Sequence, residues 1–233
     1  MSSSPNKNYL RYVILGRFLP FFLFSLFAVI HLALFLSEIK IYSQQGFSTR
    51  EQLDLVNRLV AMAFPAMVAG IYVFRKPANS GTYTPFSFLI SIYASFVLLA
   101  LKPLGSFFQI SEEQGVTEVR QLLAILTFIL GGMLVAYSIF YLRQNFSIVP
   151  EARELVSTGP YGFVRHPVYL GEILASFGFL LSVFTVFYIL IVLSFISAQV
   201  IRMNMEEALL AKSIPEYELY KQKVKYRIFP GIY

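Results

Sequence analysis

The sequence of 233 residues contains no cysteine and only two histidines, His31 and His166. Without cysteine the chain has no disulfide, no thiol nucleophile and no zinc or iron–sulfur site held by thiolates. Two histidines are too few for a multi-histidine metal centre, so we expect no bound metal. Chemistry based on metal ions or thiols is therefore not predicted for this chain.

Charge is also scarce. Charged residues make up 14% of the chain and hydrophobic residues 57%, whereas a soluble protein carries about 25% charged residues. The mean hydropathy is +0.64. This composition predicts a multi-pass integral membrane protein, and the length suits one membrane domain covering residues 1–233.

Long apolar runs divide the chain into helices. A bilayer core of about 30 Å needs about 20 apolar residues per helix. Residues 1–143 are predicted to hold four spans: Phe18–Leu36, Val60–Phe74, Phe86–Leu101 and Leu122–Leu142. The polar loops Ser37–Leu59, Arg75–Gly81 and Lys102–Gln121 separate them. Ser37-Glu38-Ile39-Lys40, rather than a small-residue cleavage pattern, follows the first run, so we interpret that run as a retained membrane helix.

The apolar segment Pro167–Met205 can be one helix or two. One straight helix would be about 58 Å long, far more than the bilayer core, at a rise of 1.5 Å per residue. A hairpin would return both ends to one side, although no glycine or proline marks a turn near Ser182–Thr185. We favour the hairpin. The predicted fold is thus an all-α bundle of about six membrane helices, followed by a cytoplasmic amphipathic helix in Glu206–Tyr233.

The basic residues support this topology. With the N-terminus inside and a hairpin at the end, most of the nineteen Lys and Arg residues fall on one side of the membrane. Cytoplasmic loops carry such an excess of positive charge. We therefore expect both termini to be cytoplasmic, in the inner membrane of a bacterial cell or the endoplasmic reticulum of a eukaryotic one.

The segment Gly159–Glu172 concentrates glycine, proline, phenol and charge at the start of an apolar run. Pro167 suits the first position of a helix, where its missing N–H needs no partner. Arg165 and His166 then lie just before a helix N-terminus, a place that favours an anion.

A second polar cluster, Arg202–Glu207, ends the same apolar region. Gln199, Arg202 and Glu206 share one helix face, and Arg202 can pair with Glu206. A hairpin would bring this cluster to Arg165 and His166. The alternative is that these side chains only reach toward lipid headgroups.

From Gln144 onward the chain resembles the isoprenylcysteine carboxyl methyltransferase and phospholipid methyltransferase superfamily. The resemblance is carried, in order, by Asn145-Phe146-Ser147, Leu155–Tyr161, Arg165-His166-Pro167-x-Tyr169-x-Gly171, Glu206-Glu207-Ala208-Leu209-Leu210, Tyr217, Tyr220, Val224 and Pro230. One departure is that Ser213 and Ile214 stand where the family usually has Phe-Gly.

The resemblance implies that S-adenosylmethionine is the cofactor and that residues 144–233 form the catalytic and cofactor-binding region. No Gly-x-Gly-x-x-Gly fingerprint offers a soluble-type nucleotide fold instead. The expected catalytic residues are Arg202, Glu206 and His166. The expected cofactor-binding residues are Leu155, Val156, Gly159, Tyr161, Arg165, His166, Pro167, Tyr169, Glu206 and Glu207.

The methyl acceptor stays open between an isoprenylcysteine-type carboxylate, a thiol and an amine, including a phospholipid amine. We expect the partners to be the bilayer and a lipophilic small molecule, phospholipid or prenylated substrate, with no nucleic acid. Two other hypotheses are an NADPH-dependent sterol-type reductase and a non-enzymatic protein of the same fold. Glu172, one turn into a membrane helix, is a candidate functional residue, whereas His31 is expected to make an interhelical hydrogen bond.

Overall fold

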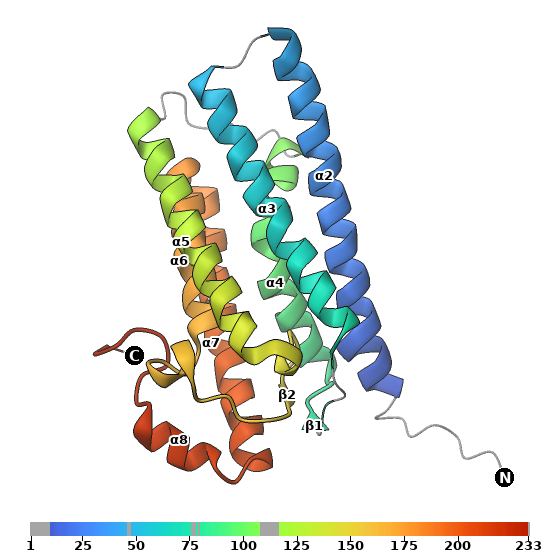
Figure 1. Cartoon of the computed structure of the whole chain (residues 1–233), viewed down its shortest axis with the longest axis vertical. Helices are drawn as coiled ribbons and strands as arrows, with labels where there is room; N and C mark the ends of the chain where they lie inside the picture. The colour runs from blue at the N-terminus through green and yellow to red at the C-terminus, as the bar shows by residue number, and fades with distance from the viewer. Residues whose placement is uncertain (1–9, 46–47, 76–77, 79, 108–116, 233) are drawn as a thin grey trace, which may run out of the picture.

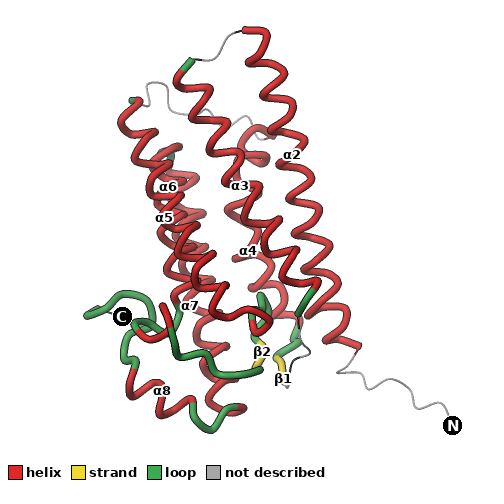
Figure 2. Tube along the Cα trace, in the orientation of Figure 1, coloured by secondary structure: helices red, strands yellow, loops and turns green. Residues whose placement is uncertain are grey.

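The computed structural model describes residues 10–45, 48–75, 78, 80–107 and 117–232 as a bundle of long helices (Figure 1). Short irregular segments, two small strands and the last helix gather at one end (Figure 2). The elements in chain order are η1 (Tyr12–Phe18), α2 (Leu19–Gln45), α3 (Thr49–Val73), β1 (Ser80–Gly81), α4 (Pro85–Phe107), α5 (Glu118–Leu142), η2 (Arg143–Asn145), β2 (Glu151–Ala152), η3 (Gly159–Gly162), α6 (Pro167–Ser182), α7 (Val186–Ser213) and α8 (Tyr217–Lys223).

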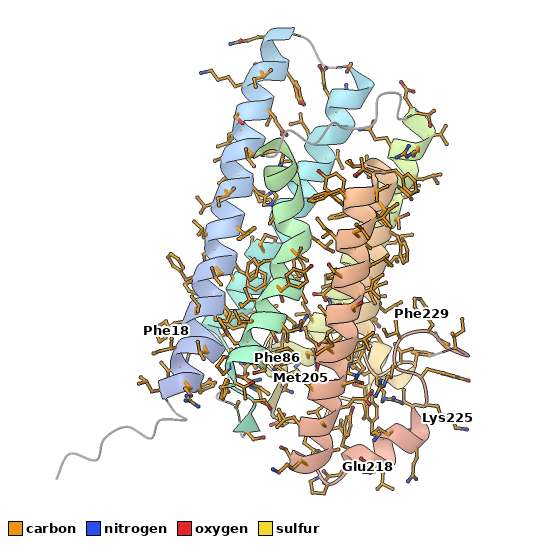
Figure 3. The ribbon with its side chains drawn as sticks, turned by 180° about the vertical axis from the view of Figure 1, so that it is seen from behind. Phe18, Phe86, Met205, Glu218, Lys225 and Phe229 are labelled. Carbon is orange, nitrogen blue, oxygen red and sulfur yellow. The ribbon has the colours of Figure 1, made fainter. Side chains whose placement is uncertain are left out.

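Three helical stretches within the described residues are long and apolar enough to cross a membrane: Tyr12–Gln44, Glu118–Asn145 and Val186–Ser213. Three shorter apolar stretches lie within α3, α4 and α6. Large apolar side chains cover the outside of the bundle, as Figure 3 shows from behind. These apolar helices confirm the prediction of a helical, multi-pass membrane protein.

The predicted polar loop Ser37–Leu59 is wrong, because α2 continues to Gln45 and α3 begins at Thr49. Ser48 and Glu51 form a capping box: the Ser48 side chain accepts from the Glu51 N–H at 3.4 Å, and the Ser48 N–H donates to the Glu51 carboxylate at 2.6 Å. Such a box satisfies two donors at a helix start. Hydropathy detected only the apolar second half of α3.

The predicted loop Lys102–Gln121 begins as the end of α4, and its residues 108–116 lie outside the described part of the chain.

The predicted hairpin is confirmed. α6 ends at Ser182 and α7 begins at Val186, where the Thr185 side chain accepts from the Tyr188 N–H at 3.4 Å. Thr185 thus caps a helix start in a turn that has neither glycine nor proline. The second arm is longer than predicted, because α7 continues through Glu206 and Glu207 to Ser213.

The amphipathic helix expected in Glu206–Tyr233 is much shorter than predicted, because α8 covers only Tyr217–Lys223. Ile214, at the departure from the family pattern, is buried with Tyr217, Tyr220 and Val224. The tail therefore folds around these apolar side chains rather than as one surface helix.

Helices α5 and α6 touch through their backbones. A Cβ atom on Gly171 would lie 2.7 Å from the Gly131 carbonyl oxygen, and one on Gly178 would lie 2.8 Å from the Ala124 carbonyl oxygen. Small residues allow this approach between membrane helices. Gly171, the last residue of the motif that begins at Arg165, therefore serves the close packing of α6 against α5.

Gly171→Ala is expected to destabilise the protein by about 1–3 kcal/mol, the usual cost of overpacking. The added methyl group would also meet Val135 at 2.7 Å. Gly70→Ala is the matched control, since a Cβ on Gly70 in α3 meets no atom of a described residue within 4 Å. Thermal unfolding in detergent measures both variants, and equal midpoints would contradict the close α5–α6 contact.

A two-residue antiparallel pairing between β1 and β2 joins the two halves of the chain, with Ser80 opposite Ala152 and Gly81 opposite Glu151. The all-α prediction missed it. Beside it, the buried carboxylate of Glu151 pairs with Arg75, with Arg153 at 2.6 Å and with the Tyr83 hydroxyl at 2.6 Å. This cluster, which we call the Glu151 cluster, fixes the segment before α6 to the end of α3.

Candidate functional site

The strand-bearing end of the bundle encloses a polar cavity of about 60 Å³. It lies between the segment that links α5 to α6, the first turns of α6 and the second half of α7. Six of the predicted site residues line it: Tyr161, Arg165, His166, Tyr169, Arg202 and Glu206. The hairpin is the reason that residues about forty positions apart in the chain meet here.

Glu207 lies beside this cavity, and its carboxylate contacts two guanidinium groups and one imidazole. Its Oε1 accepts from Arg165 Nε at 2.8 Å and lies 3.1 Å from His166 Nε2. Its Oε2 accepts from Arg227 Nη2 at 2.9 Å. The anion at the start of α6, predicted from Arg165, His166 and Pro167, is in this structure the side chain of Glu207.

The C-terminal segment completes this cluster. The Arg165 N–H donates to the Tyr226 carbonyl at 3.0 Å, and the His166 N–H donates to the Arg227 carbonyl at 2.8 Å. Arg227 also donates to Asn204 at 2.9 Å. Lys225 and Phe229, labelled in Figure 3, mark this segment beside α7. Sequence reasoning missed Arg227, which has no helical spacing from the motif, and it gave no role to Asn204, although Asn204 lies within the predicted cluster Arg202–Glu207.

Arg202 is buried, but it does not pair with Glu206 as expected. It donates to Gln199 Oε1 at 2.8 Å and to the Ile148 carbonyl at 2.9 Å, and its guanidinium lies 4.9 Å from the centre of the Tyr169 ring. Its nearest carboxylate is Glu172, with Nη1 and Oε2 3.9 Å apart. Glu206 instead accepts from the Tyr169 hydroxyl at 2.8 Å.

Tyr161 offers a hydrogen-bond donor to the cavity. Its hydroxyl is buried and makes no hydrogen bond to any residue that the structure describes, while its carbonyl accepts from the Tyr220 hydroxyl at 2.8 Å. Burial, together with the nearby Glu206 carboxylate, raises the pKa of the Tyr161 phenol well above its usual value. The phenol is therefore protonated at neutral pH.

The structure places four further predicted site residues outside the lining of the polar cavity. Leu155, Val156, Gly159 and Pro167 do not line the polar cavity. Gly159 has a positive φ of 60°, and a Cβ there would lie 2.4 Å from the Tyr141 ring, so glycine is required. Leu155 packs on the apolar cluster beneath α8, and Pro167 is the first residue of α6.

A second, larger cavity of about 450 Å³ lies inside the bundle. Its lining comes from α2 to α7 and is mostly small or apolar; Ala124 to Ala136 on α5 alone span about 18 Å at 1.5 Å per residue. His31 and Arg58 also line it. Phe64, Ser95 and Glu172 line both cavities, so the two adjoin.

Sequence comparison agrees with this architecture of a membrane bundle and a polar end. Residues 119–216, from the start of α5 to the residue before α8, match the model of the phospholipid methyltransferase family. The matched segment is similar to this family of integral membrane methyltransferases, which use S-adenosylmethionine. No curated protein sequence matches the chain.

The polar cavity has the groups that S-adenosylmethionine requires. Arg202 Nε and the Tyr161 hydroxyl are buried donors without hydrogen-bond partners among the described residues. They suit the carboxylate or the ribose, and Glu206 suits the ammonium. Tyr169 and Tyr161 offer ring faces to a cation. The cavity is smaller than the roughly 300 Å³ or more of typical ligand pockets, so we expect the surrounding segments to move apart on binding.

Proposed function

We propose that this protein transfers a methyl group from S-adenosylmethionine to a lipophilic acceptor whose apolar chain lies in the larger cavity. The observation that carries this proposal is the junction of an apolar cavity inside the membrane bundle with a polar cavity lined by the family motif. The match of residues 119–216 to the phospholipid methyltransferase family supports a phospholipid-type acceptor. The junction would bring the acceptor's polar head to the methyl donor.

We assign the following roles to residues of the two polar clusters. Arg165, His166 and Glu207 hold the start of α6 against α7 and the C-terminal segment. Tyr161, Tyr169 and Glu206 bind the cofactor, and Arg202 keeps the Ile148 carbonyl beside it. S-adenosylmethionine, when bound, supplies an electrophilic methyl group on a positively charged sulfur. Alignment of two reactants is worth about 7–11 kcal/mol of the barrier in favourable cases.

The acceptor would enter from the bilayer. Met133 on α5 lines the apolar cavity and is 63% exposed on the outer surface of the bundle. A residue that borders both the apolar cavity and the outer surface shows that the wall between them is one side chain thick. Lateral entry suits an acceptor that is dissolved in lipid rather than in water.

We place the polar cavity on the cytoplasmic side. The first and last described residues lie at the end of the bundle that holds β1, β2 and α8 (Figure 1). Arg153, Arg165, Lys221, Lys223 and Arg227 belong to segments at that end, as the excess of positive charge on the cytoplasmic side requires. Residues 1–143 then serve as the membrane scaffold, and residues 144–233 carry the catalytic region.

The purified protein is expected to bind S-adenosylhomocysteine and not NADPH in isothermal titration calorimetry. Incubation with methyl-labelled S-adenosylmethionine and a total lipid extract should then label a lipid. Binding of NADPH alone would favour a sterol-type reductase. Binding of neither compound would favour a non-enzymatic role.

A further inference from the structure

The C-terminal segment Lys221–Ile232 carries four basic residues and no acidic one. Two of these cations are paired with carboxylates on α7 and α8. The other two, Lys223 and Lys225, are exposed, and neither makes an ion pair with a residue that the structure describes. The segment therefore presents positive charge that no described acid of the chain neutralises, and such charge attracts anions.

Three large apolar side chains are exposed in the same region. Ile232 is 85% exposed and Phe229 is 41% exposed. The Ile232 N–H donates to the Phe229 carbonyl at 3.1 Å, so both residues belong to one turn. Phe163, which precedes the start of α6, is 76% exposed. Basic residues grouped with exposed aromatic and aliphatic ones are typical of segments that lie on a membrane surface.

Hydrogen bonds and burial hold these side chains in a fixed arrangement. Arg165, two residues after Phe163, donates from Nη1 to the carbonyls of Val224 and Lys225 at 2.8 Å and 2.6 Å. Val224 and Ile228 are each only 3% exposed. The C-terminal segment thus packs against the residues before α6 with one side and presents its basic and apolar side chains on the other.

The end of α5 marks the level of the membrane surface. Tyr137 and Phe140, in its last two turns, are 51% and 65% exposed on the outside of the bundle. The guanidinium of the exposed Arg143 lies 5.7 Å from the centre of the Phe140 ring. Aromatic side chains at the membrane–water interface and basic ones on its cytoplasmic side are typical of membrane helices. We therefore place the exit of α5 from the bilayer between Tyr137 and Arg143.

The exposed apolar side chains lie close to this level. Gly159, the first residue of η3, lies against the Tyr141 ring in the last turn of α5, and Phe163 directly follows η3. From the outer end of α8 the chain returns toward the start of α6 and projects from the side of the bundle (Figure 1). Lys225 and Phe229 lie on this projecting part (Figure 3). This region therefore lies beside the bundle, where the lipid headgroups are.

We propose that the apolar side chains of this region insert into the bilayer surface next to the bundle, and that its two unpaired lysines bind the anionic headgroups of phospholipids. The residues that form this tail surface are Phe163, Lys223, Lys225, Phe229 and Ile232. None of them lines either cavity, so the lipids held here are neighbours of the protein rather than its substrates. Each lysine ammonium group has three N–H donors for phosphate oxygens, and basic segments beside membrane helices prefer anionic lipids.

The absence of tryptophan from the chain allows a direct test, because a single introduced indole reports on one position. Full-length Ile232→Trp protein is reconstituted into phosphatidylcholine vesicles that contain a minor share of brominated lipid, which quenches indole fluorescence on contact. The brominated lipid is either phosphatidylglycerol or phosphatidylcholine. Both are expected to quench, and phosphatidylglycerol at least about twofold more strongly, because the lysines enrich anionic lipid around the tail surface.

Leu219→Trp is the matched control. Leu219 is 68% exposed at the same end of the molecule, but it lies on α8, beyond the ends of the bundle helices (Figure 1). Its indole should be quenched by neither brominated lipid. The triple variant Ile232→Trp, Lys223→Gln, Lys225→Gln should be quenched equally by phosphatidylglycerol and phosphatidylcholine, because the attraction to anionic headgroups is gone.

Quenching of Ile232→Trp no stronger than that of Leu219→Trp would overturn the membrane contact. Phe163→Trp repeats the measurement at a second position and should give the same order of lipids. A preference for phosphatidylglycerol that survives both lysine substitutions would overturn the headgroup site. Protection of the Ile232→Trp indole from both brominated lipid and aqueous iodide would assign the surface to a second copy of the chain instead. The measurement needs neither cofactor nor methyl transfer, so its failure leaves the proposed function intact.

Discussion

Glu207→Ala is expected to abolish binding of S-adenosylhomocysteine. The carboxylate is the common partner of Arg165, His166 and Arg227, and its removal leaves the two guanidinium groups close together without their shared counterion. Breaking a buried ion pair by removal of one partner costs about 3–5 kcal/mol. The start of α6 would then separate from α7 and the C-terminal segment, and the polar cavity would lose its shape. Isothermal titration calorimetry and thermal unfolding measure the two effects.

Glu218→Ala is the control for this variant. Glu218 is an acid on α8 whose only ion pair among the described residues is with Lys221 at 3.2 Å, and its side chain is 58% exposed. Exposed pairs contribute about 0–1 kcal/mol, so this change should leave cofactor affinity and stability unaltered. Unchanged affinity in Glu207→Ala would show that the ion-pair cluster is not needed for cofactor binding.

Gly132→Leu is expected to lower kcat/KM for the lipid acceptor by about 100-fold. Gly132 lines the apolar cavity, and within the described part of the chain a Cβ there meets no atom within 4 Å. A leucine side chain would occupy the space of about four methylene groups of the acceptor. Each buried methylene contributes about 0.8 kcal/mol, and 1.4 kcal/mol corresponds to a factor of ten. The measurement is methyl transfer to dioleoylphosphatidylethanolamine at saturating cofactor.

Gly70→Leu is the matched control, because Gly70 is also a helical glycine with open space at its Cβ but lies outside both cavities. Both variants should bind S-adenosylhomocysteine as the wild type does, since neither position borders the polar cavity. If Gly132→Leu methylates the lipid as fast as Gly70→Leu, the acceptor chain does not lie in this cavity.

The sequence predicted the hairpin through charge rather than through local conformation. The turn between Ser182 and Val186 has no glycine or proline, so the hairpin was favoured by the excess length of a single helix and by the side of the membrane on which the basic residues lie. The meeting of His166, Tyr169 and Glu206 then followed from the family motif. These parts were predictable because the distribution of charge and the order of the motifs can both be read directly from the sequence.

Other parts depend on three-dimensional packing and could not be predicted. The large cavity exists because alanine and glycine from several helices face one another, and hydropathy does not distinguish small lining residues from packed ones. Arg227 meets Glu207 through a fold of the C-terminal segment that has no periodic signal. The Glu151 cluster joins Arg75 to Arg153 across segments that looked like polar connections.

The position of Arg227 also affects how the protein is made. A ribosome delivers the spanning helices and Glu207 before it delivers Tyr226 and Arg227. Until those residues arrive, the backbone N–H groups of Arg165 and His166 lack their carbonyl partners, and Glu207 lacks one of its cations. The nascent chain can therefore insert into the bilayer while the methyl-donor site is still incomplete. The polar end of the bundle therefore acquires its full set of hydrogen bonds and ion pairs only when the C-terminal segment folds back onto α6 and α7.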